Sequence, residues 1–305
     1  MSVRPSRVLA GTLVVLGALA CSSVTATEGV SGRSVLFIGN SLTYVNDLPA
    51  MVAKVAEAAD DSIRVAMVAG PNLAVIDHTN GATDAVARID GGNWGFVLLQ
   101  QGPTPAGICR DTLVIATLRF APHVRGAGGR IVLFLPWTAR GSTGTLAAAA
   151  AESATLAARA AGGVTVPVGL AWQLALESDP TLPLYGPDGY HPAPAGTLLA
   201  ALTIYDRTFG RDVREIPAAA LAALSAPPLG TARLQVLAAA AHAAAVSLPP
   251  DPADPITRRY QSRLVRRRPL LTHSRTEPVS AAARAGRGFG RLPPPEWPRP
   301  SRRWR

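Results

Sequence analysis

Cysteine is scarce in this chain of 305 residues, which contains only Cys21 and Cys109. Two cysteines cannot build a disulfide framework, and no group of cysteines and histidines has the spacing of a zinc site. The sequence therefore predicts no metal centre, and we interpret Cys109 as a small buried residue rather than a reactive thiol.

Long hydrophobic runs are also missing. The most apolar stretch covers residues 8–20, follows Arg4 and Arg7, and is too short to cross a bilayer comfortably. A short apolar run after positive charges, followed by small residues, is typical of a secretory signal peptide. We therefore expect residues 1–26 to be a leader, removed after Ala26 as the protein is exported.

A second cleavage site stays open. Ala18-Leu19-Ala20-Cys21 is similar to a bacterial lipobox, in which Cys21 is lipidated and becomes the new N-terminus. Both alternatives predict an exported protein of the cell envelope, either secreted or a lipoprotein. Only a lipid on Cys21 would tie the chain to a membrane.

The net charge of +10 is confined to one end of the chain. Residues 251–305 contain 14 arginines and 4 acidic residues, which leaves 16 basic and 16 acidic residues in the other 250. This tail, residues 249–305, is rich in arginine and proline without apolar periodicity, so we predict that it is disordered. An anionic surface is one partner that such a tail could bind, while a nucleic acid fits an exported chain poorly. An extension without function explains it equally well.

Between leader and tail, short apolar runs alternate with helical patterns. The expected strands cover residues 34–38, 63–68, 96–99, 131–135 and 164–168. The expected helices cover 48–59, 73–89, 110–124, 145–161, 170–176, 195–209 and 218–246. Strands separated by helices imply right-handed βαβ units. The sequence predicts an α/β protein, a three-layer α/β/α sandwich on a five-stranded parallel sheet, in one domain over residues 30–248.

Two polar stretches fall where such a sheet presents its ligand site. Gly39-Asn40-Ser41 follows the first strand, and Asp188-Gly189-Tyr190-His191 precedes the helix over 195–209. Taken alone, the first is more simply a strand-to-helix turn and the second a polar turn. Both lie at the carboxyl end of the sheet, where a serine, a histidine and a carboxylate could form a nucleophilic triad.

The combined pattern resembles the SGNH (GDSL-type) hydrolase superfamily. Its four blocks are similar to Gly39-Asn40-Ser41-Leu42-Thr43, to Gly70 after the second strand, to the polar turn after the third, and to Asp188-Gly189-Tyr190-His191. The resemblance implies a flavodoxin-like SGNH fold, with Ser41 as nucleophile, His191 as general base and Asp188 as its orienting partner. It implies no metal or organic cofactor.

The resemblance also implies an oxyanion hole. In the family, donors come from the serine N–H, the second-block glycine N–H and a third-block asparagine side chain, so the first two map onto Ser41 and Gly70. The asparagine is absent, and Gln100-Gln101 stands in its place. Either glutamine amide could serve, but successive strand residues point to opposite faces, so we expect one of them, with Gln100 favoured.

Three further residues are weaker candidates for binding substrate. Asn40 precedes the nucleophile, His78 follows the second block, and Trp137 follows the fourth strand. Structural roles in the core or at the rim would explain each of them as well.

The resulting hypothesis is an exported serine esterase that hydrolyses small acyl esters or acetylated carbohydrates through an acyl-enzyme. One alternative is an acyltransferase that uses the same residues. The other is a non-catalytic lipoprotein whose SGNH-like domain binds a surface.

Overall fold

The computed structural model describes residues 33–248 of the chain. The predicted leader and the predicted basic tail lie outside the described residues, and so does Cys21. Export, lipidation and the disorder of the tail therefore stay predictions.

Five strands form one sheet in which every neighbouring pair is parallel. They are β1 (Ser34–Gly39), β2 (Arg64–Ala69), β3 (Phe96–Gln100), β4 (Arg130–Phe134) and β5 (Val164–Val166), in the spatial order β2-β1-β3-β4-β5. This confirms the predicted five-stranded parallel sheet and its flavodoxin-like order.

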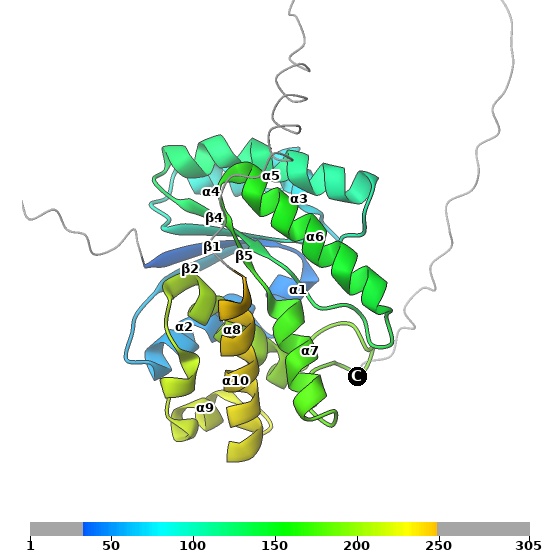
Figure 1. The fold of residues 1–305 in the computed structure, drawn as a ribbon. Coiled ribbons are helices and arrows are strands. Elements are labelled where there is room, and N and C mark those ends of the chain that lie inside the picture. The colour runs from blue at the N-terminus through cyan, green and yellow to red at the C-terminus, as the bar shows by residue number, and fades with distance from the viewer. Residues whose placement is uncertain (1–32, 249–305) are drawn as a thin grey trace, which may run out of the picture. The chain divides into compact units, whose positions relative to one another are not determined.

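Helices follow the strands along the chain. They are α1 (Ser41–Tyr44), α2 (Leu48–Ala58), α3 (Val75–Thr79), α4 (Ala85–Asp90), α5 (Ile108–Gly126), α6 (Gly144–Ala161), α7 (Val168–Ser178), α8 (Pro194–Phe209), α9 (Ala218–Leu224) and α10 (Thr231–Ser247), with a 3-10 turn, η1 (Val213–Glu215), between α8 and α9. Figure 1 shows α3 to α6 on one side of the sheet and α2, α7, α8 and α10 on the other.

The inner strands β1, β3 and β4 are buried on both faces because each contains a continuous apolar run. Val35 and Phe37 of β1 belong to a core with α2, α7, α8 and α10, whereas Leu36 and Ile38 belong to a second core with α3 to α6. Alternate residues of a strand point to opposite faces, so a continuous apolar run serves two cores at once. The layers are those of the predicted sandwich.

Two of the predicted helices are each interrupted. The segment 73–89 holds α3 and α4, separated at Gly81, whose φ of +90° is incompatible with a helix. The segment 218–246 holds α9 and α10, because Pro227 and Pro228 have no N–H to continue a helical ladder. The short helix α1 was not predicted at all.

Two smaller observations bear on the sequence-based expectations. Cys109 is exposed at the start of α5, so the expectation of a buried residue was wrong. Among the helices of residues 33–248, none has the length and apolar character needed to cross a membrane.

The sheet order fixes where a ligand can bind. After β1 the chain crosses outward to β2, and after β2 it returns past β1 to β3, so the connections diverge between β1 and β3. Open α/β sheets bind ligands outside the carboxyl ends of their strands at such a point. The segment after Gly39 lies there.

Candidate active site

Ser41 lies at the first position of a helix that begins directly after β1. Asn40 is the N-cap of α1, and its side-chain oxygen accepts the Leu42 N–H at 3.2 Å. Its side-chain nitrogen donates to Leu73 O at 3.0 Å, which ties the turn to the segment after β2. The first N–H groups of a helix have no acceptor within it, so the Ser41 N–H is available to a ligand.

Gln100, at the end of β3, supports this turn from within the protein. Its side-chain oxygen accepts the Asn40 N–H at 3.0 Å and the Thr43 hydroxyl at 2.7 Å. A Cβ atom at Gly39 would lie 2.5 Å from that oxygen and 2.4 Å from the Thr43 hydroxyl, so only glycine fits. The glycine, the glutamine and the threonine thus specify the path of the chain into Ser41.

His191 and Asp188 come from the loop between α7 and α8. The loop folds back on itself through Gly186 N–H to His191 O and Ala193 N–H to Leu184 O, both 2.8 Å. These two bonds fold the loop around the histidine, and the Arg140 N–H, which donates to Gly189 O at 2.8 Å, ties the loop to the segment after β4. The turn is therefore held in place before any side chain contacts Ser41.

These three side chains form a connected triad. His191 Nε2 lies 2.9 Å from Ser41 Oγ, and His191 Nδ1 lies 2.5 Å from Asp188 Oδ2. A carboxylate can only accept, so Nδ1 carries the proton and Nε2 is free to accept from the serine hydroxyl. The three residues that the sequence proposed for catalysis are thus within hydrogen-bonding distance, in the order that nucleophilic catalysis requires.

Asp188 is held in its ionised form. Burial acts to raise the pKa of its carboxyl, but hydrogen bonds from His191 Nδ1 and from the backbone N–H groups of Tyr190 and His191 outweigh it. The net pKa lies below the ordinary value of an aspartate. A carboxylate that stays charged near neutral pH can stabilise an imidazolium on His191.

The predicted oxyanion donors other than Ser41 are engaged elsewhere. The Gly70 N–H donates to Gly39 O at 3.2 Å, continuing the pairing of β2 with β1. Gln101 accepts the Val75 N–H at 3.1 Å and donates to the Thr104 hydroxyl at 2.7 Å. The arrangement therefore does not match the expectation for Gly70 or for Gln101.

Gln100, the favoured donor, does not match it either. Its side-chain oxygen must face the Asn40 N–H, because two donors cannot pair, and this directs its NH₂ group into the interior. That nitrogen is buried and has no partner among residues 33–248. A fully buried amide cannot reach a substrate. Gln100 instead supports the Gly39-Asn40-Ser41 turn, called the nucleophile turn below.

The weaker substrate-binding candidates turn out to be internal as well. Asn40 is only 8% exposed, and both ends of its amide are used within the protein. His78 is fully buried, with Nε2 3.1 Å from Gly39 O and Nδ1 2.8 Å from the Thr83 hydroxyl. Burial lowers the pKa of His78, so it is a neutral ring that braces the carbonyl before the nucleophile turn.

Trp137 supports the loop of the histidine instead of binding substrate. Its indole N–H donates to Tyr190 O at 2.8 Å. Its ring stacks on the ring of Trp172, with the two centroids 3.9 Å apart. It is 2% exposed and forms part of the wall of a largely apolar cavity of about 540 Å³ between α6 and α7. The sequence indicated that Trp137 is near the site but not that it contacts the backbone next to His191.

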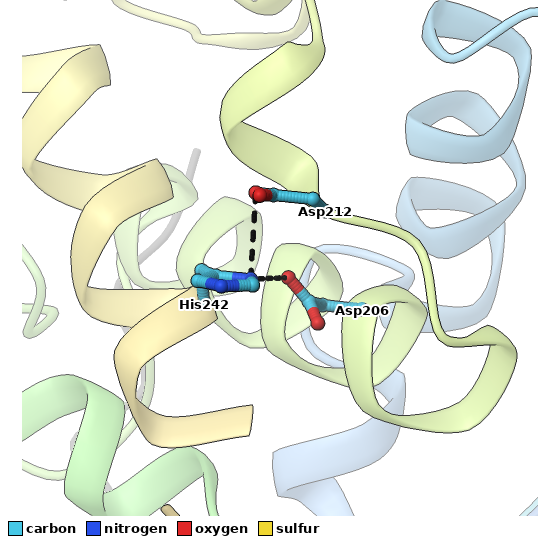
Figure 2. A group of neighbouring side chains, drawn as sticks. All are labelled: Asp206, Asp212 and His242. Carbon is cyan, nitrogen blue, oxygen red and sulfur yellow. Dashed lines mark hydrogen bonds and ion pairs between the residues drawn. The ribbon is translucent and has the colours of Figure 1, made fainter. Parts of the chain in front are cut away.

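A second group of ionisable side chains lies among α8, η1 and α10 (Figure 2). His242 Nδ1 lies 2.9 Å from Asp206 Oδ2 and 3.4 Å from Asp212 Oδ1. Asp212 also forms a two-pronged pair with Arg214, whose hydrogen bonds lower the pKa of Asp212 to about 2. His242 Nδ1 thus pairs with both carboxylates, and these contacts connect α8, η1 and α10.

Comparison with known proteins identifies the fold. No protein-family model matches the chain, and no curated protein matches its sequence. A candidate SGNH hydrolase from Slackia heliotrinireducens is similar in structure, with 24% identity over 57% of this chain and 98% of that one and a TM-score of 0.50. A DUF4886 family protein from Bacteroides uniformis is similar with 17% identity over 74% of this chain and 98% of that one and a TM-score of 0.57. The chain has the three-layer α/β fold of SGNH hydrolases, as its sequence predicted.

Proposed function

We propose that this chain is a serine hydrolase of carboxylic esters. One observation carries the proposal: Ser41 Oγ lies 2.9 Å from His191 Nε2, whose other ring nitrogen is held by Asp188. A serine hydroxyl becomes a nucleophile only when a base takes its proton, and this pair supplies the base in the required tautomer. The similar fold of a candidate SGNH hydrolase supports the same class.

The reaction follows from that geometry. Ser41 Oγ attacks the ester carbonyl carbon while His191 Nε2 takes its proton, and Asp188 stabilises the imidazolium. The tetrahedral intermediate collapses, the bond from carbon to the alcohol oxygen breaks, and His191 returns the proton to the departing alkoxide. Water then attacks the acyl-serine with His191 as base, which releases a carboxylic acid and restores the serine.

The openness of the site bears on the substrate. The side chains of His191 and Asp188 are 36% and 50% exposed, so the triad lies near the surface rather than at the end of a tunnel. A triad near the surface is compatible with a bulky alcohol component, and we propose small acyl or acetyl esters, such as an acetylated carbohydrate, as substrates. Transfer of the acyl group to a second alcohol uses the same intermediate and would appear as a product with added acceptor.

A non-catalytic, surface-binding role is less well supported. Such a role requires no alignment of serine, histidine and aspartate, yet three separate features hold them together: the Asn40 cap, the paired loop before α8 and the Gln100 brace. We also propose export to the cell envelope, and this rests on the leader-like sequence of residues 1–26 alone. The basic tail remains a candidate for binding an anionic surface.

The proposal is tested by hydrolysis of p-nitrophenyl acetate with the purified chain. We expect Ser41→Ala and His191→Ala to lower kcat by about 10⁴-fold or more, because the residues of a triad act as a unit. His123→Ala is the matched control, since His123 Nδ1 pairs with Asp90 at 2.8 Å on the surface in the same way. Equal activity of wild type and Ser41→Ala would refute the proposal.

A further inference from the structure

The site is short of hydrogen-bond donors for a developing oxyanion. Of the expected donors, only the Ser41 N–H has no acceptor within its helix, while Gly70, Gln100 and Gln101 are engaged or buried. A tetrahedral intermediate in ester hydrolysis carries a full negative charge on oxygen, and each donor directed at it contributes substantially to the rate. Stabilising the oxyanion therefore requires a further donor at the same edge of the sheet.

The Tyr190 hydroxyl lies at that edge, beside the turn that follows β3. A Cβ atom built on Gly102 would be 3.0 Å from the Tyr190 hydroxyl oxygen, so the hydroxyl packs directly against this glycine. At its other end, the tyrosine ring packs edge-on against the His191 ring, with centroids 5.4 Å apart. Tyr190 thus spans from the general base to the segment where the family would place its asparagine.

The tyrosine is held from both sides of its backbone. Its N–H donates to Asp188 Oδ1 at 3.0 Å, and its carbonyl accepts the Trp137 indole N–H at 2.8 Å. The partly buried ring packs against the larger core cluster. A donor fixed in this way is preorganised, which is the property that makes an oxyanion contact effective.

The hydroxyl itself is unused within the fold. Across residues 33–248, no side chain or carbonyl accepts a hydrogen bond from it, in contrast to Tyr185, whose hydroxyl donates to Thr138 O at 2.9 Å. Burial and the nearby charge of Asp188 raise the pKa of Tyr190, so the hydroxyl keeps its proton at neutral and moderately alkaline pH. Among the described residues it is a donor without an acceptor, carried by a tyrosine whose ring packs against the catalytic histidine.

We propose that the Tyr190 hydroxyl donates a hydrogen bond to the substrate's carbonyl oxygen as that oxygen becomes an oxyanion. In this role it replaces the asparagine side chain that is missing after β3, and it acts together with the Ser41 N–H. The inference rests on the proposed esterase function. It adds a catalytic residue that the sequence pattern did not indicate.

The test compares two tyrosines that differ in how their hydroxyls are used. Tyr190→Phe removes a hydroxyl without a partner, so we expect an unchanged Tm, a KM within about twofold of wild type and a kcat reduced by about 10²-fold. Tyr185→Phe removes a hydroxyl that bonds Thr138 O, so we expect a lower Tm and an unchanged kcat. Fluorophosphonate labelling of Ser41 should slow in Tyr190→Phe by a similar factor, because the phosphoryl oxygen occupies the oxyanion position.

Three results would contradict the donor role of the Tyr190 hydroxyl. If Tyr190→Phe hydrolyses p-nitrophenyl acetate as fast as wild type, or if Tyr185→Phe loses as much kcat, the donor role is wrong while the esterase function stands. If wild type itself neither hydrolyses the ester nor reacts with the fluorophosphonate, the proposed function fails and this inference fails with it.

Discussion

Gln100 accepts the backbone N–H of Asn40 through its side-chain oxygen at 3.0 Å, one residue before Ser41. The same oxygen accepts the Thr43 hydroxyl at 2.7 Å, so a single atom connects β3 to both sides of the serine. Gln100 is fully buried, and water cannot replace it. Gln100 therefore helps to position Ser41 relative to the sheet.

Replacing Gln100 by alanine should therefore affect both stability and catalysis. Gln100→Ala leaves the Asn40 N–H and the Thr43 hydroxyl without an acceptor in the interior, and we expect the free energy of unfolding to fall by about 1–3 kcal/mol. We also expect a lower kcat, because the turn loses the brace that positions Ser41. Urea denaturation and p-nitrophenyl acetate kinetics measure the two effects, and a stable variant with wild-type kcat would contradict the role of Gln100.

His78 predicts a dependence of stability on pH. Its pKa is lowered in the folded protein by burial, whereas in the unfolded chain it titrates near its ordinary value. As pH falls from 7 through the unfolded pKa of about 6.5, the unfolded chain binds a proton that the folded protein does not. The free energy of unfolding therefore falls until the lower, folded pKa is reached.

The measurement is denaturation of wild type and His78→Asn at pH 7 and pH 5. The stability advantage of wild type should be larger at pH 7 and smaller at pH 5. His123→Ala, which alters an exposed histidine, serves as the control. An advantage of wild type over His78→Asn that grows toward pH 5 would contradict a neutral, buried His78.

The group formed by His242, Asp206 and Asp212 should contribute to stability and not to catalysis. Among residues 33–248, His242→Ala leaves the buried Asp206 carboxylate with a hydrogen bond from the Val213 N–H alone, at 3.3 Å. We expect the free energy of unfolding to fall by about 1–3 kcal/mol with kcat unchanged. Since His242 Nδ1 pairs directly with both carboxylates, EDTA should leave the Tm of wild type unchanged, and a drop in Tm with EDTA would instead indicate a metal ligand set.

A substitution at Gly102 tests the role of the Tyr190 hydroxyl in a second way. In Gly102→Ala the new Cβ lies 3.0 Å from the tyrosine oxygen and displaces it, so we expect a kcat several-fold below that of wild type. The double variant Gly102→Ala/Tyr190→Phe should be no slower than Tyr190→Phe alone, because both changes act on one hydrogen bond. Fully additive losses in kcat would show that Gly102 acts independently of the hydroxyl.

The sheet could be predicted from the sequence because its strands are continuous apolar runs that end in polar turns. β1 is the clearest case, since its four apolar residues after Ser34 lead straight into the Gly39-Asn40-Ser41 turn. The helices were less predictable. Alanine-rich segments favour helix throughout, and the interruptions at Gly81 and at Pro227 depend on single residues within them.

The site was predictable only where chain position determines it. Ser41, Asp188 and His191 lie at the carboxyl edge because strand and loop order bring them there. The direction of a side chain is not determined by order alone: Gln100 follows β3 as expected, yet its amide faces Asn40 in the interior. Tyr190 and Gly102 lie on two different loops and are 88 positions apart in the sequence, so no local pattern indicates their contact.

Covalent labelling of Ser41 tests the central claim most directly. The purified chain is treated with a fluorophosphonate at neutral pH and digested, and the modified peptide is identified by mass spectrometry. The triad predicts a single adduct on Ser41 that disappears in His191→Ala, whereas the exposed Ser62 stays unmodified. Wild-type protein that remains unlabelled, or that is labelled at another serine with His191 dispensable, would contradict it.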